Sequence, residues 1–533
     1  MRFALVILLA MFLAKASAQT SFPYELELDT IVIPELGGLQ SYAVGQSNGK
    51  WLVIGGRLDG LHRRQPWATF DLDGHNNQLW VVDPIQKKKW TAKLTDLDSS
   101  LQEQLSSTNM EFFQKENQLV LLGGYGYSAR KDDHITFPYI TLISVDEVIN
   151  AVINNESFSN HLQQVEDQQL ALTGGKLCLL DNIYYLVGGH RFDGKYNPMN
   201  NPTFEQTYSN SVQRFVIKET HQGLKIVHYP SFKNDTLLHR RDFNVLPTIA
   251  AQTNQEELMA FSGVFQYDIN VPYLSTVHIT NEGITEKETF AQYYNHYHCA
   301  STALNDSLNN NMHYFFFGGI AHYYDSLGLL VGDNDVPFTK NVTHVVRDKN
   351  GNLAEYLTTL KMPGYLGAAS EFIPNPSIEV YPNGVIKMNS LSEDKILLGY
   401  IFGGINSSAA NIFWANTGVE SKASQMIYPI YLKKATQLKE TLNPQSVNGI
   451  QLQVVPDPID KRITLMFTAK ESGMASFQIT NSTGKVISTK KIKKLVAGKH
   501  SKTYKFRKQK AGDQLIFHFT INNELVTQKL VVQ

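Results

Sequence analysis

The chain has 533 residues, of which 42% are hydrophobic, 18% are charged and 11% are aromatic. This composition excludes a disordered polar chain and predicts a globular protein with one large repeat domain and a smaller second domain. The formal net charge is −1, but residues 450–533 hold 15 Lys or Arg against 5 Asp or Glu. Because strand-like alternation in that basic segment indicates a solvated β surface, we expect no nucleic-acid partner.

The first 18 residues have the pattern of a secretory signal peptide. Arg2 is followed by an apolar stretch from Phe3 to Leu13 and then by Ala16-Ser17-Ala18, the small-x-small pattern of a signal peptidase site. That stretch is too short to span a bilayer, and no later apolar segment is long enough to do so. We therefore expect residues 1–18 to be removed, no transmembrane segment, and a protein that is secreted or held at the outer cell surface.

Residues 24–33 alternate like a β-strand, with Leu26, Leu28, Ile31 and Ile33 on the apolar positions. A ring of sheets that is left open exposes strand edges, so its two ends need to be joined. We expect this N-terminal strand to complete the last sheet of the domain that follows. Residues 435–443 are the alternative source of the closing strand.

Six runs of β-prone residues end in a pair of small residues, five times Gly-Gly and once Ser-Gly. They are Val53–Gly56, Leu119–Gly124, Tyr184–Gly189, Leu258–Gly263, Phe315–Gly319 and Tyr400–Gly404. Such pairs suit a buried strand whose end takes positive φ or lets another backbone approach closely. Each run is followed by an irregular stretch and then by a further strand, predicted over 78–84, 139–145, 211–217, 274–279, 342–347 and 426–432.

This repeating order resembles the kelch repeat, which places a double glycine at the end of the second strand. The first unit fits best, with Gly55-Gly56, the strand Leu79–Asp83 and Trp90. The resemblance implies a six-bladed β-propeller over residues 19–444, and it says little about function. Cys178 and Cys299 fall in the expected first strands of the third and fifth blades, so we expect them to be free and buried.

After Asn443-Pro444 the pattern changes to short alternating strands. They are expected over 451–455, 463–468, 475–480, 485–489, 501–506, 514–521 and 525–532, which predicts a small Ig-like β-sandwich over residues 450–533. Pro456-Asp457-Pro458, Asn481–Val486 and Lys529–Val532 resemble landmarks of the C-terminal sorting domain of the type IX secretion system of Bacteroidetes. The resemblance implies export by that machinery. The family's Gly-x-Tyr is missing, because Gly512-Asp513-Gln514-Leu515 stands there, and an ordinary Ig-like accessory module is the alternative.

In kelch-like blades, the loops after the second strands and the segments that lead into the first strands open on one face. The cationic and aromatic side chains of these segments are our candidate ligand-binding residues: Arg57, His62, Arg63, Arg64, Arg130, His190, Arg191, Arg240, Arg241, His296, His298, His322 and Tyr323. Arg forks bind carboxylate or sulfate, and aromatic faces stack on sugar rings. An anionic glycan or an acidic protein ligand is therefore expected. Salt bridges within the long loops are the alternative role for any one of these residues.

An enzyme is the second hypothesis, since kelch-fold sugar epimerases and mutarotases act on acidic sugars at the same face. That resemblance implies Glu111 as the general acid or base, with His298 as the alternative. His296 and His298 stand i, i+2, so both could face the same way and share a metal with His190 or His322, but this is the less favoured reading. Asp71–Gly74 and Gly332–Asp335 look like calcium loops but lack the further ligands, so turn chemistry is preferred there. We expect no metal and no cofactor.

Overall fold

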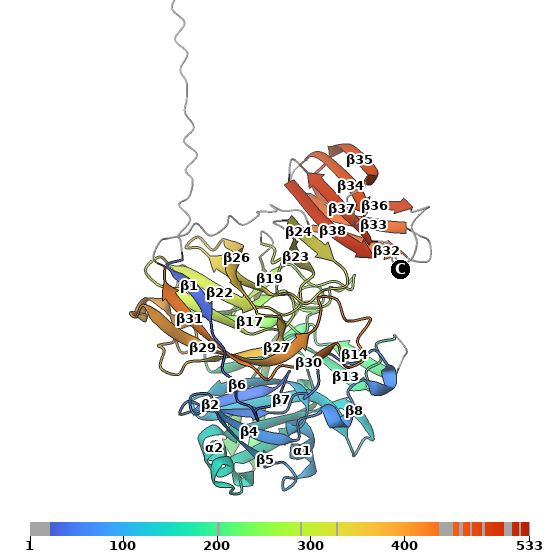
Figure 1. Cartoon of the computed structure of the whole chain (residues 1–533). Coiled ribbons are helices and arrows are strands. Elements are labelled where there is room, and N and C mark those ends of the chain that lie inside the picture. Colours follow the sequence, from blue (N-terminus) through green and yellow to red (C-terminus); the bar gives the residue numbers. More distant parts are fainter. Residues whose placement is uncertain are drawn as a thin grey trace, which may run out of the picture.

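The computed structural model describes residues 22–435, except 200–202, 288–289 and 327–328, and residues 451–531, except 458–461, 470–471, 482–485, 506–513 and 522–523. The described chain is all-β, as predicted, with two short α-helices and 38 strands (Figure 1). No helix within these residues is long and apolar enough to cross a membrane. The expected signal peptide and the alternative closing segment, apart from Ala435, lie outside the described residues.

Six sheets follow one another along the first part of the chain, each with four main strands in antiparallel order. The first sheet consists of β2 (Ala43–Ser47), β3 (Lys50–Ile54), β4 (Gln78–Asp83) and β5 (Lys88–Lys93). The second consists of β6 (Thr108–Lys115), β7 (Gln118–Ser128), β9 (Tyr139–Ser144) and β10 (Leu162–Glu166), with β8 (Asp133–Thr136) beside β7. The third consists of β11 (Lys176–Leu180), β12 (Ile183–Val187), β15 (Ser211–Thr220) and β16 (Gly223–Lys233). A separate hairpin, β13 (His190–Gly194) and β14 (Phe204–Tyr208), follows β12.

The remaining three sheets repeat this order. The fourth consists of β17 (Asn244–Ile249), β18 (Glu256–Phe261), β19 (Thr276–Ile279) and β20 (Ile284–Glu286). The fifth consists of β21 (Ser301–Asp306), β22 (Asn311–Phe317), β25 (Asn341–Arg347) and β26 (Leu353–Lys361), with β28 (Ile386–Lys387) parallel to β21. The sixth consists of β27 (Tyr365–Pro374), β29 (Lys395–Ser407), β31 (Ile427–Lys434) and the N-terminal β1 (Tyr24–Leu28), with β30 (Ser421–Ala423) beside β29. The hairpin of β23 (Tyr323–Ser326) and β24 (Leu329–Asp333) leaves the fifth sheet.

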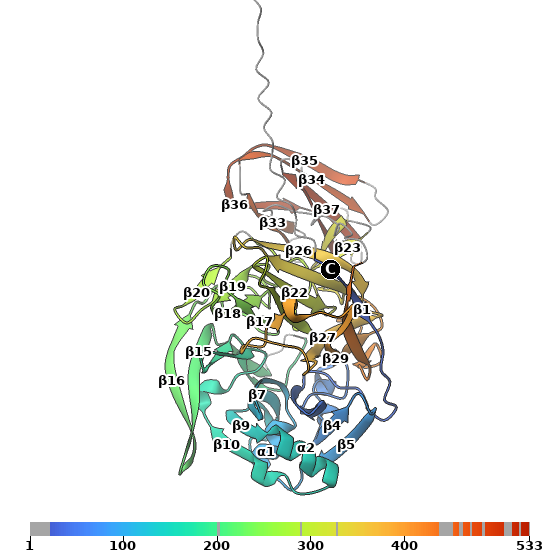
Figure 2. The same cartoon turned by 90° about the vertical axis from the view of Figure 1, so that its left-hand side faces the viewer.

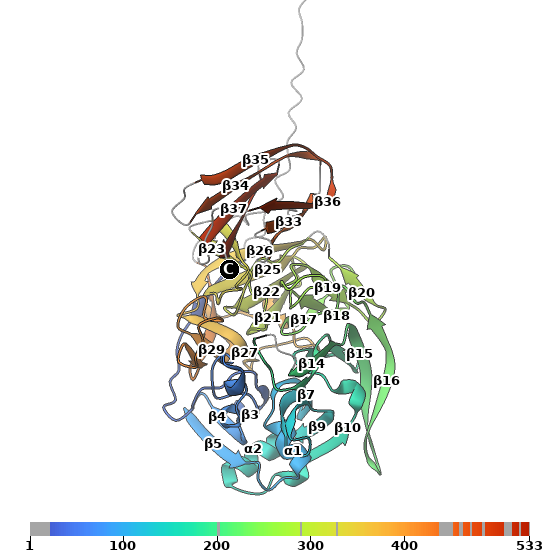
Figure 3. The same ribbon diagram turned by 90° about the vertical axis from the view of Figure 1, so that its right-hand side faces the viewer.

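Helices are confined to the connections. α2 (Val145–Asn154) buries Val148, Ile149 and Val152 in one cluster with Leu52 and other apolar residues of the first sheet. The other helices are α1 (Ser99–Leu105), η1 (Pro66–Ala68), η2 (Leu72–Gly74), η3 (Ser159–His161), η4 (Gln168–Leu170) and η5 (Met388–Ser390). Figures 2 and 3 show α1 and α2 at the outer side of the molecule, away from the centre.

The middle strands of the sheets are buried on both faces. Every residue of β22 is buried, and β3 is buried from Trp51 to Ile54. Figures 2 and 3 show the six sheets arranged around a common centre, so each sheet lies between two neighbours. A strand in such a place has two apolar faces, which explains the continuous apolar runs in the sequence.

The glycine pairs let successive sheets approach closely. The second residue of each pair donates its N–H to a carbonyl just before or early in the next sheet: Gly56 to Ser107, Gly124 to Leu172, Gly189 to Arg240, Gly263 to His296, Gly319 to Leu366 and Gly404 to Leu39, at 2.8–3.2 Å. This set is cyclic, since the sixth sheet leads back to the first. A Cβ on Gly123 would stand 1.8 Å from the Leu172 carbonyl oxygen, and its φ is +65°. Only glycine therefore fits without a shift of the backbone.

A second cyclic set of hydrogen bonds, which we name the inner ring, joins one residue from each sheet. Its N–H to C=O bonds run from Ser41 to Ala369, Ala369 to His298, His298 to Asp242, Asp242 to Gly174, Gly174 to Asn109 and Asn109 back to Ser41, at 2.6–3.4 Å. Five of the six residues have φ between +49° and +68°. The inner ring fixes where the segments leading into all six sheets meet.

β1 supplies the outer strand of the sixth sheet. It pairs antiparallel with β31 over five residues, from Tyr24 opposite Lys434 to Leu28 opposite Ile430. Phe22, Leu26 and Leu28 pack against the core shared by the fifth and sixth sheets. The first and last strands of this part of the chain are thus held together.

The C-terminal part contains seven strands in two groups. β32 (Gln451–Asp457), β33 (Arg462–Ala469) and β36 (Gly498–Lys505) form a three-stranded sheet. β34 (Gly473–Asn481), β35 (Val486–Leu495), β37 (Gln514–Ile521) and β38 (Glu524–Val531) belong to the second. Phe467, Phe477 and Phe519 are buried where the two groups meet. In this second sheet β38 also pairs with β24 of the large domain, so its strand order is β23-β24-β38-β37-β34-β35.

Candidate functional site

A cavity of about 460 Å³ lies where segments from all six sheets meet. Five inner-ring residues line it: Ser41, Asn109, Asp242, His298 and Ala369. The other lining residues come from the loops after the second strands and from the segments that lead into the first strands. These are the segments that the sequence predicts on one face of the large domain.

Aromatic side chains form a large part of the cavity wall, with nine of its 34 lining residues. The aromatic lining residues are Phe70, Tyr125, Phe192, Tyr196, Phe265, Tyr297, Phe338, Phe413 and Trp414. Several of them pack edge to face, with ring centroids of Tyr125 5.2 Å from both Phe70 and Phe192. Tyr125 also donates its hydroxyl to the Gly194 carbonyl at 2.7 Å. Trp414 keeps 49% of its surface exposed at the rim. The wall is therefore rigid inside and open at one aromatic edge.

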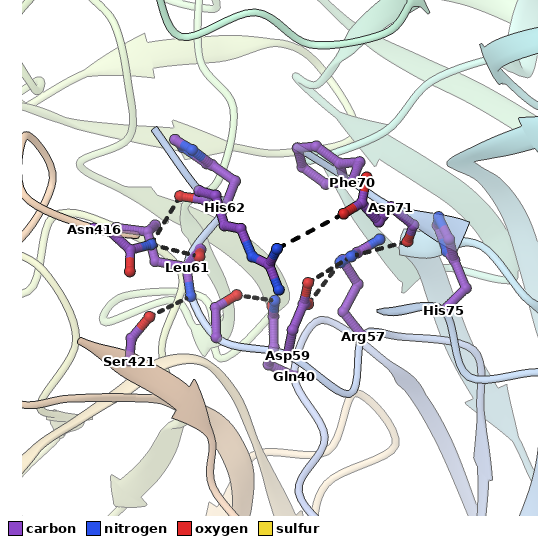
Figure 4. Close-up of polar contacts among 12 residues, drawn as sticks. Gln40, Arg57, Asp59, Leu61, His62, Phe70, Asp71, His75, Asn416 and Ser421 are labelled. Atoms are coloured by element: carbon purple, nitrogen blue, oxygen red, sulfur yellow. Dashed lines mark hydrogen bonds and ion pairs between the residues drawn. The ribbon is translucent and has the colours of Figure 1, made fainter. Parts of the chain in front are cut away.

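Arg57, directly after the first glycine pair, is the most enclosed cation of the cavity (Figure 4). It is 2% exposed and forms a bidentate pair with Asp59, through Nε at 2.7 Å and Nη2 at 2.6 Å. Its guanidinium lies 5.1 Å from the centroid of Phe70. Nη1 is buried and has no hydrogen-bond partner among the described residues. A buried donor without an acceptor is rare, and it marks a place for water or a ligand.

His62 stands on the same loop and is neutral at pH 7. Burial lowers the pKa of its imidazole to about 4. Its ring packs edge-on against Tyr196 at 4.8 Å and Phe413 at 5.3 Å. Asn416 holds the loop by donating to the carbonyls of Leu61 and His62 (Figure 4). His62 therefore adds a flat, uncharged ring to the aromatic wall.

His190 and Arg241 form a second polar group on the wall. Burial, and then the nearby charge of Arg241, hold the pKa of His190 well below its usual value. Its Nδ1 accepts a hydrogen bond from Gln206 Nε2 at 2.6 Å. Arg241 donates from Nε to the Tyr208 hydroxyl at 3.1 Å and from Nη1 to Asp242. His190 is thus a neutral acceptor beside a paired cation.

His298 connects the cavity to charged groups on the first strands. Its Nε2 lies 3.0 Å from Glu371 Oε1, and Lys176 Nζ lies 3.6 Å from Glu371 Oε2. Burial alone would raise the pKa of Glu371, but Lys176 and His298 lower it below its ordinary value. Glu371 is therefore an anion that orients the His298 ring from behind.

Glu111 belongs to the same neighbourhood but does not line the cavity. It is 4% exposed, and Gly175 donates its N–H to Oε1 at 2.7 Å. Burial raises the pKa of Glu111 to about 8, so it is largely protonated at neutral pH. The structure therefore places Glu111 behind the cavity wall, and of the two catalytic candidates only His298 faces the cavity.

Five of the thirteen candidate ligand-binding residues line the cavity: Arg57, His62, His190, Arg241 and His298. Both arginines are already paired with aspartates, and Asp242, Asp333 and Asp335 also line the cavity. The sequence predicts a face that is both cationic and aromatic. The cavity contains nine aromatic residues, but its three aspartates outnumber its two arginines, so it is not cationic.

Arg240 was expected at the ligand face and instead belongs to the core. Its side chain is fully buried, and its guanidinium donates to the Leu237 carbonyl at 2.6 Å, to the Ser275 carbonyl at 2.9 Å and to the Ser262 carbonyl. It also lies 3.9 Å from the centroid of the Tyr273 ring. Arg240 ties together the loops around the fourth pair, which has Ser262 in place of glycine.

His296, His322 and Tyr323 were also expected at the ligand face and are buried behind it. His296 Nε2 donates to the Gln292 carbonyl at 2.8 Å, and its Nδ1 accepts the N–H of His322 at 2.8 Å. Burial lowers the pKa of His296 to about 3 and that of His322 to about 4. Tyr323 is 1% exposed in an apolar cluster with Tyr293. These three side chains support the fifth sheet.

Four further candidates lie on the surface and do not line the cavity: Arg63, Arg64, Arg130 and Arg191. Arg63 Nη1 is 4.0 Å from Asp71, and Arg191 Nε is 2.7 Å from Asp193. Arg64 donates to the Trp414 carbonyl at 3.0 Å. For Arg63, Arg64 and Arg191, the alternative of contacts that hold the loops describes the structure better.

Sequence reasoning missed most of the aromatic wall. Phe70, Phe192, Phe265, Phe338 and Phe413-Trp414 were not selected, although each stands in a segment after a second strand. Bulky aromatic residues in a loop, as at Phe413-Trp414 between Asn411 and Asn416, were the available signal. Among the described residues, no group of three or more His, Cys, Asp or Glu is placed to hold a metal ion. Both cysteines are free and buried.

No family model and no curated protein match this chain. Solved structures that are similar to this chain include YjhT, at 9% sequence identity and a TM-score of 0.40. The similarity covers 73% of this chain and 93% of the YjhT chain. An exo-1,5-α-L-arabinanase from a bovine ruminal metagenomic library has 9% identity and a TM-score of 0.24, with coverage of 74% and 93%. An arabinoxylan arabinofuranohydrolase of glycoside hydrolase family 43 from Bacillus subtilis has 9% identity and a TM-score of 0.29, with coverage of 92% and 96%. Inferences about function therefore rest on the geometry of this chain.

Proposed function

We propose that this chain is an exported six-bladed propeller of the kelch type whose central cavity binds a glycan. The six sheets with four main strands each, the two cyclic sets of hydrogen bonds and the six small-residue pairs support the propeller. The signal-like residues 1–18 support export. The basic C-terminal segment, with its seven strands and its sequence landmarks, supports a type IX sorting domain, with that secretion machinery as a partner.

The aromatic wall is the observation that carries the ligand class. Nine aromatic side chains surround about 460 Å³, which is within the range of roughly 300–1,000 Å³ typical of small-ligand sites. Sugar rings present apolar C–H faces that stack on such rings, and their hydroxyls pair with a few fixed polar groups. Arg57, Gln40 and His298 supply such groups on this wall. A protein ligand has less support, because the site is an enclosed volume and not a broad surface.

An acidic group on the glycan also has less support. Arg57 and Arg241 are both paired with aspartates, so an incoming carboxylate would compete with Asp59 or Asp242. Salt screens interactions between exposed charges strongly and stacking much less. Binding that persists unchanged in high salt would therefore identify a ligand held mainly through its sugar faces.

A glycan array with the whole chain, followed by calorimetry on any hit, tests this proposal. Trp414→Ala removes the exposed aromatic edge and is expected to weaken binding about tenfold or more, about 1.4 kcal/mol. Trp67→Ala is the matched control, since Trp67 is 77% exposed and does not line the cavity. Equal effects of the two substitutions, or no glycan bound at all, would count against the proposal.

A carbohydrate-active enzyme, epimerase-like or mutarotase-like and acting on an acidic sugar, is the second candidate, favoured by the contact between His298 and Glu371. A cavity imidazole backed by a carboxylate is the arrangement of a general base. NMR of the reducing end of any bound sugar separates the two functions. Anomer or epimer exchange that disappears in His298→Gln supports an enzyme, and binding without exchange supports a lectin-like role.

A further inference from the structure

One wall of the cavity is continuous with a strand that pairs with the C-terminal domain. β24 runs parallel to β38, with Val331 opposite Thr527, Gly332 opposite Gln528 and Asp333 opposite Lys529. The only other partner of β24 among the described strands is β23, on its other edge. Figure 1 shows β24 and β38 side by side where the two domains meet.

The last residue of β24 and the residues that follow it enter the cavity. Asp333, Asn334, Asp335, Val336 and Phe338 all line it. Asp333 is 2% exposed; its Oδ2 accepts from Asn411 Nδ2 at 3.1 Å and its Oδ1 accepts the Asp335 N–H at 3.1 Å. Phe338 donates its N–H to the Ala410 carbonyl at 2.8 Å, next to the loop that carries Phe413 and Trp414. The position of this wall therefore depends on where β24 ends.

We propose that the C-terminal domain acts as a structural support for the ligand cavity, holding its Asp333–Phe338 wall by adding β38 to the edge of β24. A two-stranded hairpin alone is marginally stable in water, and added strands stabilise it. With β38 in place, β24 becomes an inner strand of a six-stranded sheet. Loss of the domain leaves a two-stranded hairpin with an open edge next to the cavity. The proposal concerns the cavity itself and holds whichever ligand it binds.

Hydrogen–deuterium exchange of the whole chain, read by mass spectrometry, tests the support. Thr527→Pro interrupts β38 opposite Val331, because proline removes an N–H and breaks a strand. Thr489→Pro is the matched control on β35, the far edge of the same sheet. We expect amides 329–338 to exchange about tenfold faster in Thr527→Pro and to stay unchanged in Thr489→Pro. Exchange of 524–531 shows in the same experiment whether β38 has opened.

An open β38 with unchanged exchange at 329–338 would overturn the proposal. If β38 stays paired in Thr527→Pro, an engineered disulfide provides an independent test. Val331→Cys with Thr527→Cys is expected to cross-link under mild oxidation, since the two residues are in register. Val331→Cys with Thr503→Cys, on β36 of the other sheet, is the control pair and should stay reduced. Failure of the first pair to cross-link any faster than the control would also overturn the proposal. The exchange arm reports on the wall and the disulfide arm on the pairing of β24 with β38, so both remain informative even if no glycan binds.

Discussion

The large domain and the C-terminal domain are built from the same antiparallel strands, but they differ in how their sheets meet. In the large domain, sheets pack on both faces and glycine pairs bring neighbouring backbones into hydrogen-bond contact. In the C-terminal domain, β34 alternates buried and partly exposed residues, which is the pattern of a sheet with one covered face. Close packing on both faces gathers loops from six sheets at one centre. Packing on one face leaves the loops at the sheet ends.

Removal of β1 is expected to have the largest effect on the large domain. Deletion of residues 19–36 takes away the outer strand of the sixth sheet and the apolar contacts of Phe22, Leu26 and Leu28. We expect a loss of roughly 3–5 kcal/mol, by analogy with the removal of buried side chains. Calorimetry of the whole chain measures it as a lower Tm of the main transition. An unchanged melt would mean that β1 adds nothing to closure.

The glycine pairs give the next largest effect. Gly123→Ala places a Cβ 1.8 Å from the Leu172 carbonyl oxygen at a φ of +65°, and we expect a loss of about 3 kcal/mol or more. Gly223→Ala is the control, because Gly223 also has a positive φ, +101°, but has no atom within 4 Å of the added Cβ. That control should lose only about 1 kcal/mol. Urea denaturation measures both, and equal losses would show that close approach between sheets is unimportant.

Acid is expected to weaken the large domain through a buried histidine pair. His313 Nδ1 lies 2.9 Å from His344 Nε2, and Phe22 packs on both rings. Burial lowers the pKa of His313 from 6.5 to about 4, so the unfolded chain binds a proton between these values that the folded chain does not. Stability contributed by the neutral ring is therefore lost as the pH falls from about 6.5 to 4, by about 3 kcal/mol.

His313→Asn removes the part of the pH dependence of stability that comes from protonation of His313. Urea midpoints measured at several pH values in this window should fall less steeply in the variant than in the unchanged chain. His221→Asn, at an exposed turn between β15 and β16, is the control and should leave the slope as it is. A slope that is equally steep in His313→Asn would place the acid sensitivity elsewhere.

The smallest effects are expected at the surface arginines. Arg63→Ala, Arg64→Ala and Arg191→Ala remove exposed side chains that do not line the cavity, so each should change stability by less than about 0.5 kcal/mol. Affinity for a glycan found on the array should also stay within about twofold. A large loss of affinity in any of them would extend the binding site beyond the cavity.

Strand positions could be predicted from the sequence because their causes are local. β4, β9, β15, β19, β25 and β31 each overlap a stretch that follows a glycine pair in the sequence, and the seven C-terminal strands overlap the expected ranges. The alternation of residues 24–28 likewise indicates a strand, now seen as β1. Apolar runs and turn residues act over a few positions, so one sequence reveals them.

Side-chain roles in the loops depended on distant partners and could not be predicted. Arg240 looks like Arg241 in the sequence, yet the distant carbonyls of Ser262 and Ser275 hold the first in the core. The second lies at the cavity, where its distant partner is the Tyr208 hydroxyl. Glu371 carries no local signal, because its contact with His298 joins two sheets. The repeat predicts where the cavity lies. The charge of the cavity could not be predicted, because it depends on which arginines are already paired with aspartates.

The pairing of β1 with β31 has a consequence for the order in which the protein matures. Tyr24 is synthesised early, whereas its partner Lys434 leaves the ribosome only after about four hundred intervening residues. The outer strand of the sixth sheet cannot pair until then, and contacts so distant in sequence form slowly. The growing chain therefore keeps an unpaired strand edge until almost the whole large domain has been made, so the pairing of β1 with β31 is a late step of folding.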